Sequence, residues 1–149
     1  MHLSLDDASE REAHALVASY LEGLPATEEW VQHVEFDPEL HRWYLRFGCE
    51  GRDATTIYFD LRQRSLWYEV YFMPDPPANH LELYRWLLRR NHTMYGARFS
   101  LGSDGDVYLT GRVPLEHLTI DELDRTIGVI YETVETWFQP AIQMGFGRR

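Results

Sequence analysis

The sequence predicts an α+β fold, with one antiparallel β-sheet whose helices lie mainly on one face. Between residues 30 and 72, four segments with alternating apolar residues follow one another, separated by short polar or Gly- and Pro-containing connections. Such short connections favour antiparallel pairing of consecutive strands. Helical patterns precede and follow groups of strands and do not alternate with single strands, which is typical of α+β proteins. The expected order is α-β-β-β-β-α-β-β-α, in a single domain spanning residues 1–149.

The first helix and the first four strands follow from hydrophobic periodicity. Residues 4–24 have apolar side chains at helical spacing, and Gly23 and Pro25 are expected to end this helix. The strands that follow alternate with period two, so each presents one apolar face to the predicted core. Their apolar sets are Trp30, Val34 and Phe36; Trp43, Leu45 and Phe47; Thr55, Ile57, Phe59 and Leu61; and Leu66, Tyr68, Val70 and Phe72.

The remaining elements are a second helix over about residues 78–92, two short strands and a third helix. Ala97, Phe99 and Leu101 mark one strand, Val107 and Leu109 the other, and a turn over residues 103–105 joins them.

The third helix carries the clearest local signal. Thr119 and Glu122 form a capping box at its start, with Leu118 and Leu123 placed for a hydrophobic staple. Pro140 is expected to end or kink this helix near residue 139, and residues 144–149 are expected to fray.

Composition excludes several function classes. The formal net charge is −10, which opposes sequence-independent binding to nucleic acid or to an anionic membrane. All 14 basic residues are arginines, which excludes lysine-dependent catalysis and a Walker-type phosphate loop. The single cysteine, Cys49, has Glu50 beside it, so we expect neither a disulfide nor a nucleophilic thiolate. With no signal-peptide pattern and no apolar stretch of membrane-spanning length, we expect a cytoplasmic protein.

No catalytic or metal-binding pattern stands out, and no cofactor is expected. The seven histidines show no i, i+4 helical pair and no HExxH motif. Acidic pairs such as Asp6 and Asp7 lie at helix starts, where they offset the helix dipole. Asp104 and Asp106 lack the further acids of an EF-hand calcium loop and fit a hairpin turn better. These observations predict a protein that is not an enzyme.

The strand faces opposite the apolar sets carry aromatic and arginine residues. Tyrosine, tryptophan and arginine are enriched in protein interfaces, so we interpret this face as a partner-binding surface. The alternative, that aromatic residues there only stabilise the sheet locally, has about equal weight. The predicted surface consists of Tyr44, Tyr58, Trp67, Tyr71, Tyr108, Arg42, Arg46 and Arg112.

The second helix is apolar nearly all round, which indicates burial on more than one side. We interpret it as a homodimer interface that includes Leu83, Trp86 and Leu87. The competing interpretation is that the helix is buried in the core of its own chain.

From the second helix onward the chain resembles the YbjN family, a group labelled bacterial sensory transduction regulators. The resemblance is carried by residues 87–91 (LLRRN), 97–101 (ARFSL), 104–109 (DGDVYL), 112–115 (RVPL) and 118–123 (LTIDEL). It implies a fold like that of class I type III secretion chaperones, which are small acidic dimers that hold extended segments of partner proteins. The family has no established enzymatic activity, so no catalytic residue is transferred.

Two matched residues are expected to be structural: Asn91 would close the second helix, and Gly105 would supply the turn.

The sequence therefore predicts a non-enzymatic protein-binding module, chaperone-like or regulatory, with an unknown protein partner. The alternative is a small-molecule sensor with a pocket between helices and sheet, and an enzyme of unrecognised type is a third class. An open aromatic sheet face would favour a protein partner, whereas a closed cavity would favour the sensor.

Overall fold

A computed structural model describes residues 4–147 and shows one six-stranded antiparallel sheet with three α-helices. The sheet order is β1-β2-β3-β4-β6-β5, so the first four strands form a meander and β6 lies between β4 and the edge strand β5. The predicted α+β class and element order are confirmed. The elements are α1 (Ser4–Thr27), β1 (Val31–Asp37), β2 (Arg42–Cys49), β3 (Arg52–Arg62), β4 (Ser65–Met73), α2 (His80–Thr93), β5 (Arg98–Leu101), β6 (Val107–Pro114), the short 3-10 helix η1 (Leu115–His117) and α3 (Ile120–Phe146).

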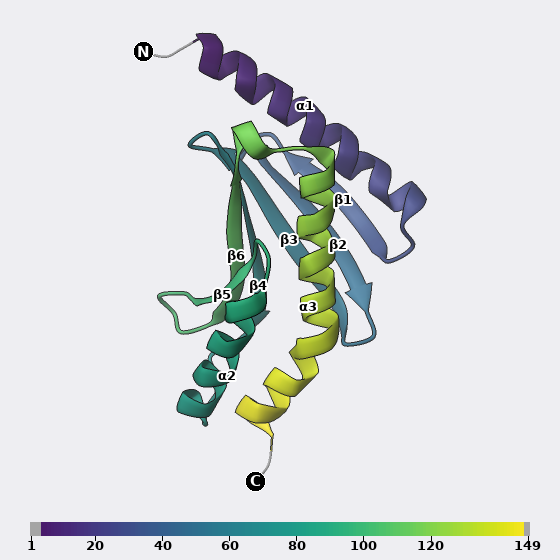
Figure 1. Cartoon of the computed structure of the whole chain (residues 1–149). Coiled ribbons are helices and arrows are strands. Elements are labelled where there is room, and N and C mark those ends of the chain that lie inside the picture. Colours follow the sequence, from purple (N-terminus) through teal and green to yellow (C-terminus); the bar gives the residue numbers. More distant parts are fainter. Residues whose placement is uncertain (1–3, 148–149) are drawn as a thin grey trace.

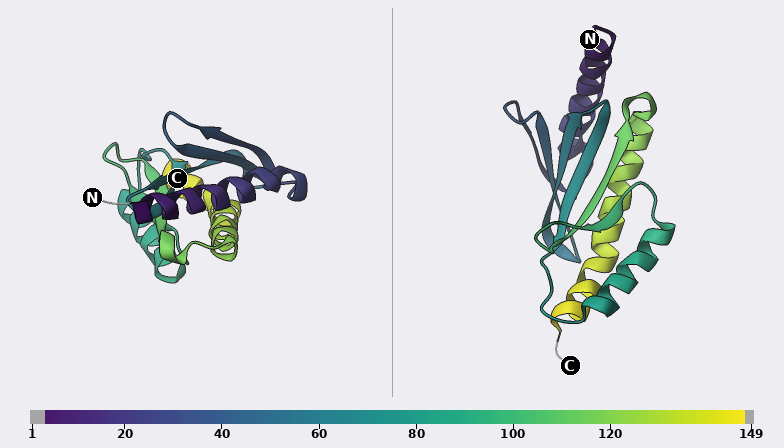
Figure 2. Two further views of the ribbon diagram at one scale, coloured as in Figure 1. Left: turned by 90° about the horizontal axis from the view of Figure 1, so that it is seen from above. Right: turned by 90° about the vertical axis from the view of Figure 1, so that its left-hand side faces the viewer.

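The helices lie on one side of the sheet (Figures 1 and 2). The long helix α3 runs across β2, β3 and β4, α1 packs along β1, and α2 lies beside the end of α3 and against β5. The view from above shows the same separation, with the helices below the strands. In the described part of the chain, residues 4–147, no helix covers the reverse face of the sheet (Figures 1 and 2).

The apolar strand residues face the helices as predicted, and the register aligns them in rows. Phe59 pairs with Trp43 on one side and Tyr68 on the other, and all three are buried. A second row crosses five strands and is also buried throughout. Its members are Leu45, Ile57, Val70, Leu109 and Phe99. Because side chains alternate between faces, this register fixes which residues point to the open side.

Two helix ends differ from the prediction because tertiary packing overrides the local effect of proline. Helix α1 includes Pro25 and ends at Thr27. Helix α3 continues through Pro140 to Phe146. Its last turns are held by Gly145, whose Cα lies against Pro76, and by the Asn79 amide, which donates to the Met144 carbonyl oxygen at 2.8 Å. The part of the predicted frayed tail that the structure describes is therefore helical up to Phe146.

Of the capping box predicted at the start of α3, the bond to the Thr119 side chain is confirmed. The Glu122 backbone N–H donates to the Thr119 hydroxyl at 3.0 Å. The Glu122 carboxylate instead accepts a hydrogen bond from the Tyr95 hydroxyl, which lies 2.9 Å from both carboxylate oxygens. This contact ties the start of α3 to the segment between α2 and β5.

The β5–β6 turn has the glycine conformation that the sequence predicts, with φ of +87° at Gly105. Asn91, in contrast, lies inside α2, which ends two residues later. Its side chain has a different role, described below.

Candidate functional site

The predicted partner-binding residues lie together on the open face, in cross-strand rows. The first row runs Arg42, Asp60, Trp67, Arg112 across β2, β3, β4 and β6. The second runs Tyr44, Tyr58, Glu69, Thr110 across the same strands. Tyr71 and Tyr108 pair in the third row, and Arg46 lies exposed between His33 and Thr56. The structure thus places all eight predicted residues on one face.

The aromatic side chains of this face form edge-to-face pairs and remain accessible. The Tyr44 and Tyr58 rings lie 5.3 Å apart at 88°, and the Tyr71 and Tyr108 rings lie 5.6 Å apart at 78°. Tyr71 is 37% exposed, and the other aromatic residues of the set are half-buried. Such pairing holds each ring in one orientation while leaving an apolar surface available to a partner.

Arg42 is already neutralised within the first row. Its guanidinium makes two bonds to the Asp60 carboxylate, at 2.7 Å from Nε and 3.0 Å from Nη2. The hydrogen bonds to Asp60 raise the pKa of Arg42 above its usual value. The guanidinium also lies 5.2 Å from the centre of the Tyr58 ring. Arg42 therefore packs against the Tyr58 ring, and its charge is largely neutralised by Asp60.

Trp67 lies against two arginine side chains and is bonded to the end of β3. Its indole N–H donates to the Arg62 carbonyl oxygen at 3.1 Å, which fixes the ring across the end of β3. The guanidinium groups of Arg62 and Arg112 lie 4.3 Å and 5.0 Å from the centre of this ring. A hollow of about 330 Å³ opens beside them, bordered also by Tyr58 and Thr110. The hollow therefore lies beside Arg62 and Arg112, with Asp60 and Glu69 also on its border.

The sequence analysis missed Asp60 and Arg62 as members of this surface. The signal was present, because both residues follow Tyr58 at spacings of two along β3 and therefore share its face. Their roles depend on Arg42 and Trp67, which belong to neighbouring strands. Only the strand pairing brings those partners together.

At the other end of the face, the Tyr108 hydroxyl donates a hydrogen bond to the Asp104 carboxylate at 3.1 Å. Desolvation and this hydrogen bond raise the pKa of Tyr108 to about 12. The ring therefore stays neutral at physiological pH and is held by the β5–β6 turn.

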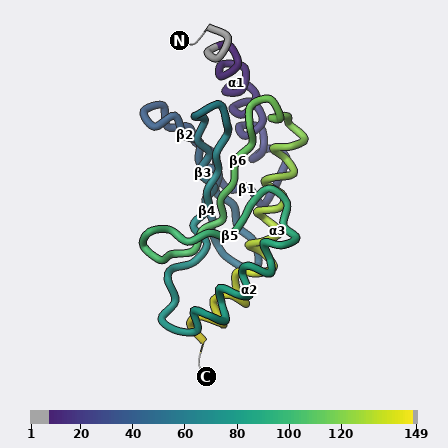
Figure 3. The backbone as a smooth tube through the Cα atoms, turned by 60° about the vertical axis from the view of Figure 1, so that its left-hand side comes forward, coloured from purple at the N-terminus to yellow at the C-terminus, as the bar shows by residue number. Residues whose placement is uncertain are grey.

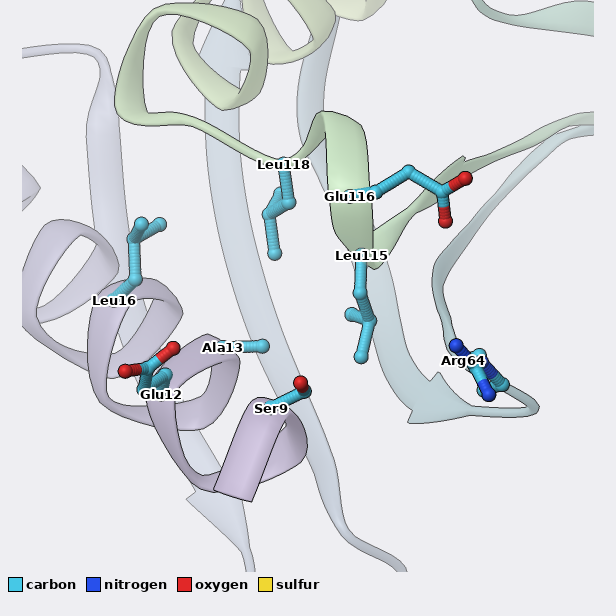
Figure 4. Close-up of a pocket in the computed structure, with 8 residues that line it drawn as sticks. All are labelled: Ser9, Glu12, Ala13, Leu16, Arg64, Leu115, Glu116 and Leu118. Atoms are coloured by element: carbon cyan, nitrogen blue, oxygen red, sulfur yellow. The ribbon is translucent and has the colours of Figure 1, made fainter. Parts of the chain in front are cut away.

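The space between helices and sheet is filled by side chains. Trp43, Phe47 and Phe59 are each at most 1% exposed and occupy its centre. A hollow of about 330 Å³ lies at the molecule's upper end between α1 and the η1 segment (Figure 4). Ser9 and Leu16 contribute to one wall and Leu115 and Leu118 to the other, and the hollow is open to solvent.

No cluster of three or more His, Cys, Asp or Glu able to hold a metal ion occurs in the part of the chain that the structure describes. Burial and a hydrogen bond to Glu135 raise the pKa of the Cys49 thiol, so the thiolate is disfavoured there. Among residues 4–147, no helix is both long and apolar enough to span a bilayer.

The predicted dimer residues of α2 are mostly used within the chain. Leu83 and Leu87 are buried in the chain's own core. Trp86 packs edge-on against Trp137 of α3, with the ring centres 5.5 Å apart. The side of α2 that faces solvent carries other leucines, Leu81 at 73% and Leu88 at 66% exposed.

Asn91 joins α2 to the edge strand β5, which lie side by side (Figure 3). Its side-chain oxygen accepts from the Phe99 backbone N–H at 2.7 Å, and its amide donates to the Phe99 carbonyl at 3.1 Å. A side-chain amide thereby occupies both backbone groups of Phe99. At this point the outer edge of β5 cannot pair with an added strand.

The family comparison matches this chain over residues 21–143 to the YbjN model, described as "Putative bacterial sensory transduction regulator". The chain belongs to the YbjN family. The matched range includes all six strands, α2 and most of α3, so the open face of this YbjN protein lies wholly within it.

Mycobacterial proteins are similar in sequence to this YbjN chain. The uncharacterized protein ML2442 of Mycobacterium leprae is 34% identical over 136 residues, covering 89% of this chain and 68% of the relative. The uncharacterized protein Mb0497 of Mycobacterium bovis is 36% identical over 84 residues, covering 56% of this chain and 46% of the relative. The alignment thus spans less than half of the M. bovis protein.

Solved structures with the same fold come from type III secretion. A chain from the HopA1–SchA chaperone–effector complex matches with a TM-score of 0.57 and 14% identity, covering 86% of this chain and 97% of the other. A chain from the complex of the Yersinia pestis type III secretion chaperone SycH with a stable fragment of YscM2 matches with a TM-score of 0.51 and 16% identity, covering 78% and 94%. The YbjN chain therefore has a type III secretion chaperone-like fold, as the resemblance implied.

Proposed function

We propose that this YbjN protein is a non-enzymatic binding module, chaperone-like or regulatory, that holds an extended segment of a partner protein on its open sheet face. The observation that carries the proposal is the set of aromatic and arginine rows on the face without helices. Rigid aromatic side chains bind at low entropic cost, and arginines recognise carboxylates and carbonyl groups. Two fold neighbours are chaperones solved in complex with a partner protein, which supports protein binding by this fold.

The small-molecule sensor is less well supported than protein binding. A ligand pocket is concave and encloses most of its ligand. In this protein large buried side chains fill the helix–sheet interface, including Trp43 and Phe59. The cytoplasmic location stays a prediction.

Trp67→Ala and Tyr44→Ala are each expected to weaken partner binding by about 1–3 kcal/mol, the scale of an interface hot spot. Partners would first be captured from the native cell with the wild-type chain and identified by mass spectrometry. The identified segment would then be titrated calorimetrically against each variant.

Tyr95→Ala is the matched control, because Tyr95 is also an exposed aromatic residue but lies on the helix side, bonded to Glu122. Partner segments that bind Trp67→Ala and Tyr44→Ala as tightly as wild type would argue against the open face as the binding surface.

We also propose a homodimer, now through the solvent side of α2. Leu81 and Leu88 are its exposed leucines, and a groove of about 390 Å³ between α2 and β5 continues this apolar surface to Leu101. Predominantly apolar surface of this kind on a monomer marks an interaction site.

Leu88→Asp should weaken such a dimer by about 2 kcal/mol or more, because a carboxylate would be buried in an apolar contact. Sedimentation at micromolar concentration measures the effect, with Leu40→Asp in the β1–β2 turn as an exposed-leucine control. Wild-type protein that sediments as a monomer at these concentrations would refute the dimer.

A further inference from the structure

The open face gathers two arginines around one tryptophan, in a protein whose net charge is −10. The Arg42 charge is matched by Asp60, but the guanidinium groups of Arg62 and Arg112 both lie over the Trp67 ring. Among the side chains of residues 8–147, no ion pair joins either of these two groups to a carboxylate. Two like charges held around one ring gain from an anion placed between or beside them.

The first cross-strand row already contains one arginine–carboxylate pair. At its β2–β3 end, Arg42 and Asp60 are joined by two N–H···O bonds. Its β4–β6 end has the ring and Arg112, and the neighbouring acid of the row, Asp60, is already bonded to Arg42. The hollow beside Trp67 lies at this end. A carboxylate seated there would accept bidentate hydrogen bonds of the kind that guanidinium groups make best.

We infer that the partner segment carries an internal Asp or Glu whose side-chain carboxylate binds Arg62 and Arg112 beside Trp67. This inference rests on the proposed protein-binding function and specifies its partner chemistry. Glu69, in the adjacent row, and Asp60 also border the hollow and repel carboxylates, so the two arginines offset this repulsion for one acid and not for several. The site therefore selects a segment with one acidic residue at this position and not an acidic run.

The test uses a library of random 12-residue peptides displayed with both ends fused, so that no peptide has a free carboxyl terminus. The full chain is the bait, and Trp67→Ala is the bait for counter-selection. Peptides that prefer the wild type should share an Asp or Glu at one position. Changing that residue to Asn or Gln, or Arg112→Gln in the protein, should each lower the affinity about tenfold or more. Combining the two changes should cost little beyond either one.

Arg125→Gln is the matched control, because Arg125 is also an exposed arginine beside an aromatic ring, 5.1 Å from the centre of the Tyr95 ring, but lies on the helix side. Selected peptides that lack a shared acid, or that bind Arg112→Gln as tightly as wild type, would overturn the inference while leaving protein binding at this face intact. A library that yields no peptide preferring the wild type over Trp67→Ala would overturn both the proposed surface and the inference. Circular dichroism of each variant confirms that the bait is folded.

Discussion

Phe59→Ala is expected to lower the free energy of unfolding by about 3–5 kcal/mol, the usual cost of removing a fully buried aromatic side chain. Phe59 is 0% exposed and lies between Trp43 and Tyr68 in the register of the sheet. Its Tyr68 neighbour is anchored by a hydrogen bond from its hydroxyl to the Gly96 carbonyl oxygen. The site therefore cannot collapse easily around the missing ring, and most of the cavity would remain. Urea denaturation of the two proteins measures the difference.

Trp67→Ala is the matched comparison, because Trp67 lies on the neighbouring strand but faces the open side. It loses one hydrogen bond and the contacts of the half-buried ring with two exposed arginines. We expect it to cost less than about 1.5 kcal/mol. If Trp67→Ala destabilised the protein as strongly as Phe59→Ala, the aromatic face would be part of the core and the proposed binding surface would be wrong.

Asn91→Ala is expected to cost about 2–4 kcal/mol of stability, because it leaves both backbone groups of Phe99 without their partners. Phe99 is only 7% exposed, so water can replace the lost bonds only partly. The Phe99 amide should also exchange with solvent deuterium much faster than in the wild type. Urea denaturation and amide exchange by NMR measure the two effects.

His92→Ala is the control, since it alters the next, exposed position of α2. Asn91→Asp keeps the acceptor for the Phe99 N–H but places a carboxylate oxygen against the Phe99 carbonyl, so it should also destabilise. Unchanged exchange of the Phe99 amide in Asn91→Ala would show that Asn91 does not hold the edge of β5.

Local sequence rules predicted most of the elements because the forces involved are local. Period-two alternation in β2 to β4 gave both the strands and the face of each residue, since a pleated strand allows only two directions. The Thr119 cap and the Gly105 turn were predictable for the same reason, because a few neighbouring residues satisfy them. All eight predicted open-face residues followed from this alternation.

Predictions went wrong where distant segments pack together. Proline weakens a helix locally, yet α3 passes Pro140 because Gly145 packs against Pro76 and Asn79 bonds the Met144 carbonyl. Asn91 looked like a residue that closes a helix, but its partner is Phe99 on the following strand. The role of α2 was open to two interpretations because apolar periodicity does not reveal which partner buries it.

The sequence by itself determined the class of fold, the order of its elements and which residues share the open face, because hydrophobic periodicity depends only on backbone geometry. Only the tertiary structure decided which arginines on that face are paired. Arg42 meets Asp60 across one strand boundary, whereas Arg62 and Arg112 approach Trp67 from β3 and β6. These contacts depend on the sheet order, in which β6 pairs with β4. Sheet order is set by packing of the whole chain, and therefore no local pattern specified the charge that the hollow presents.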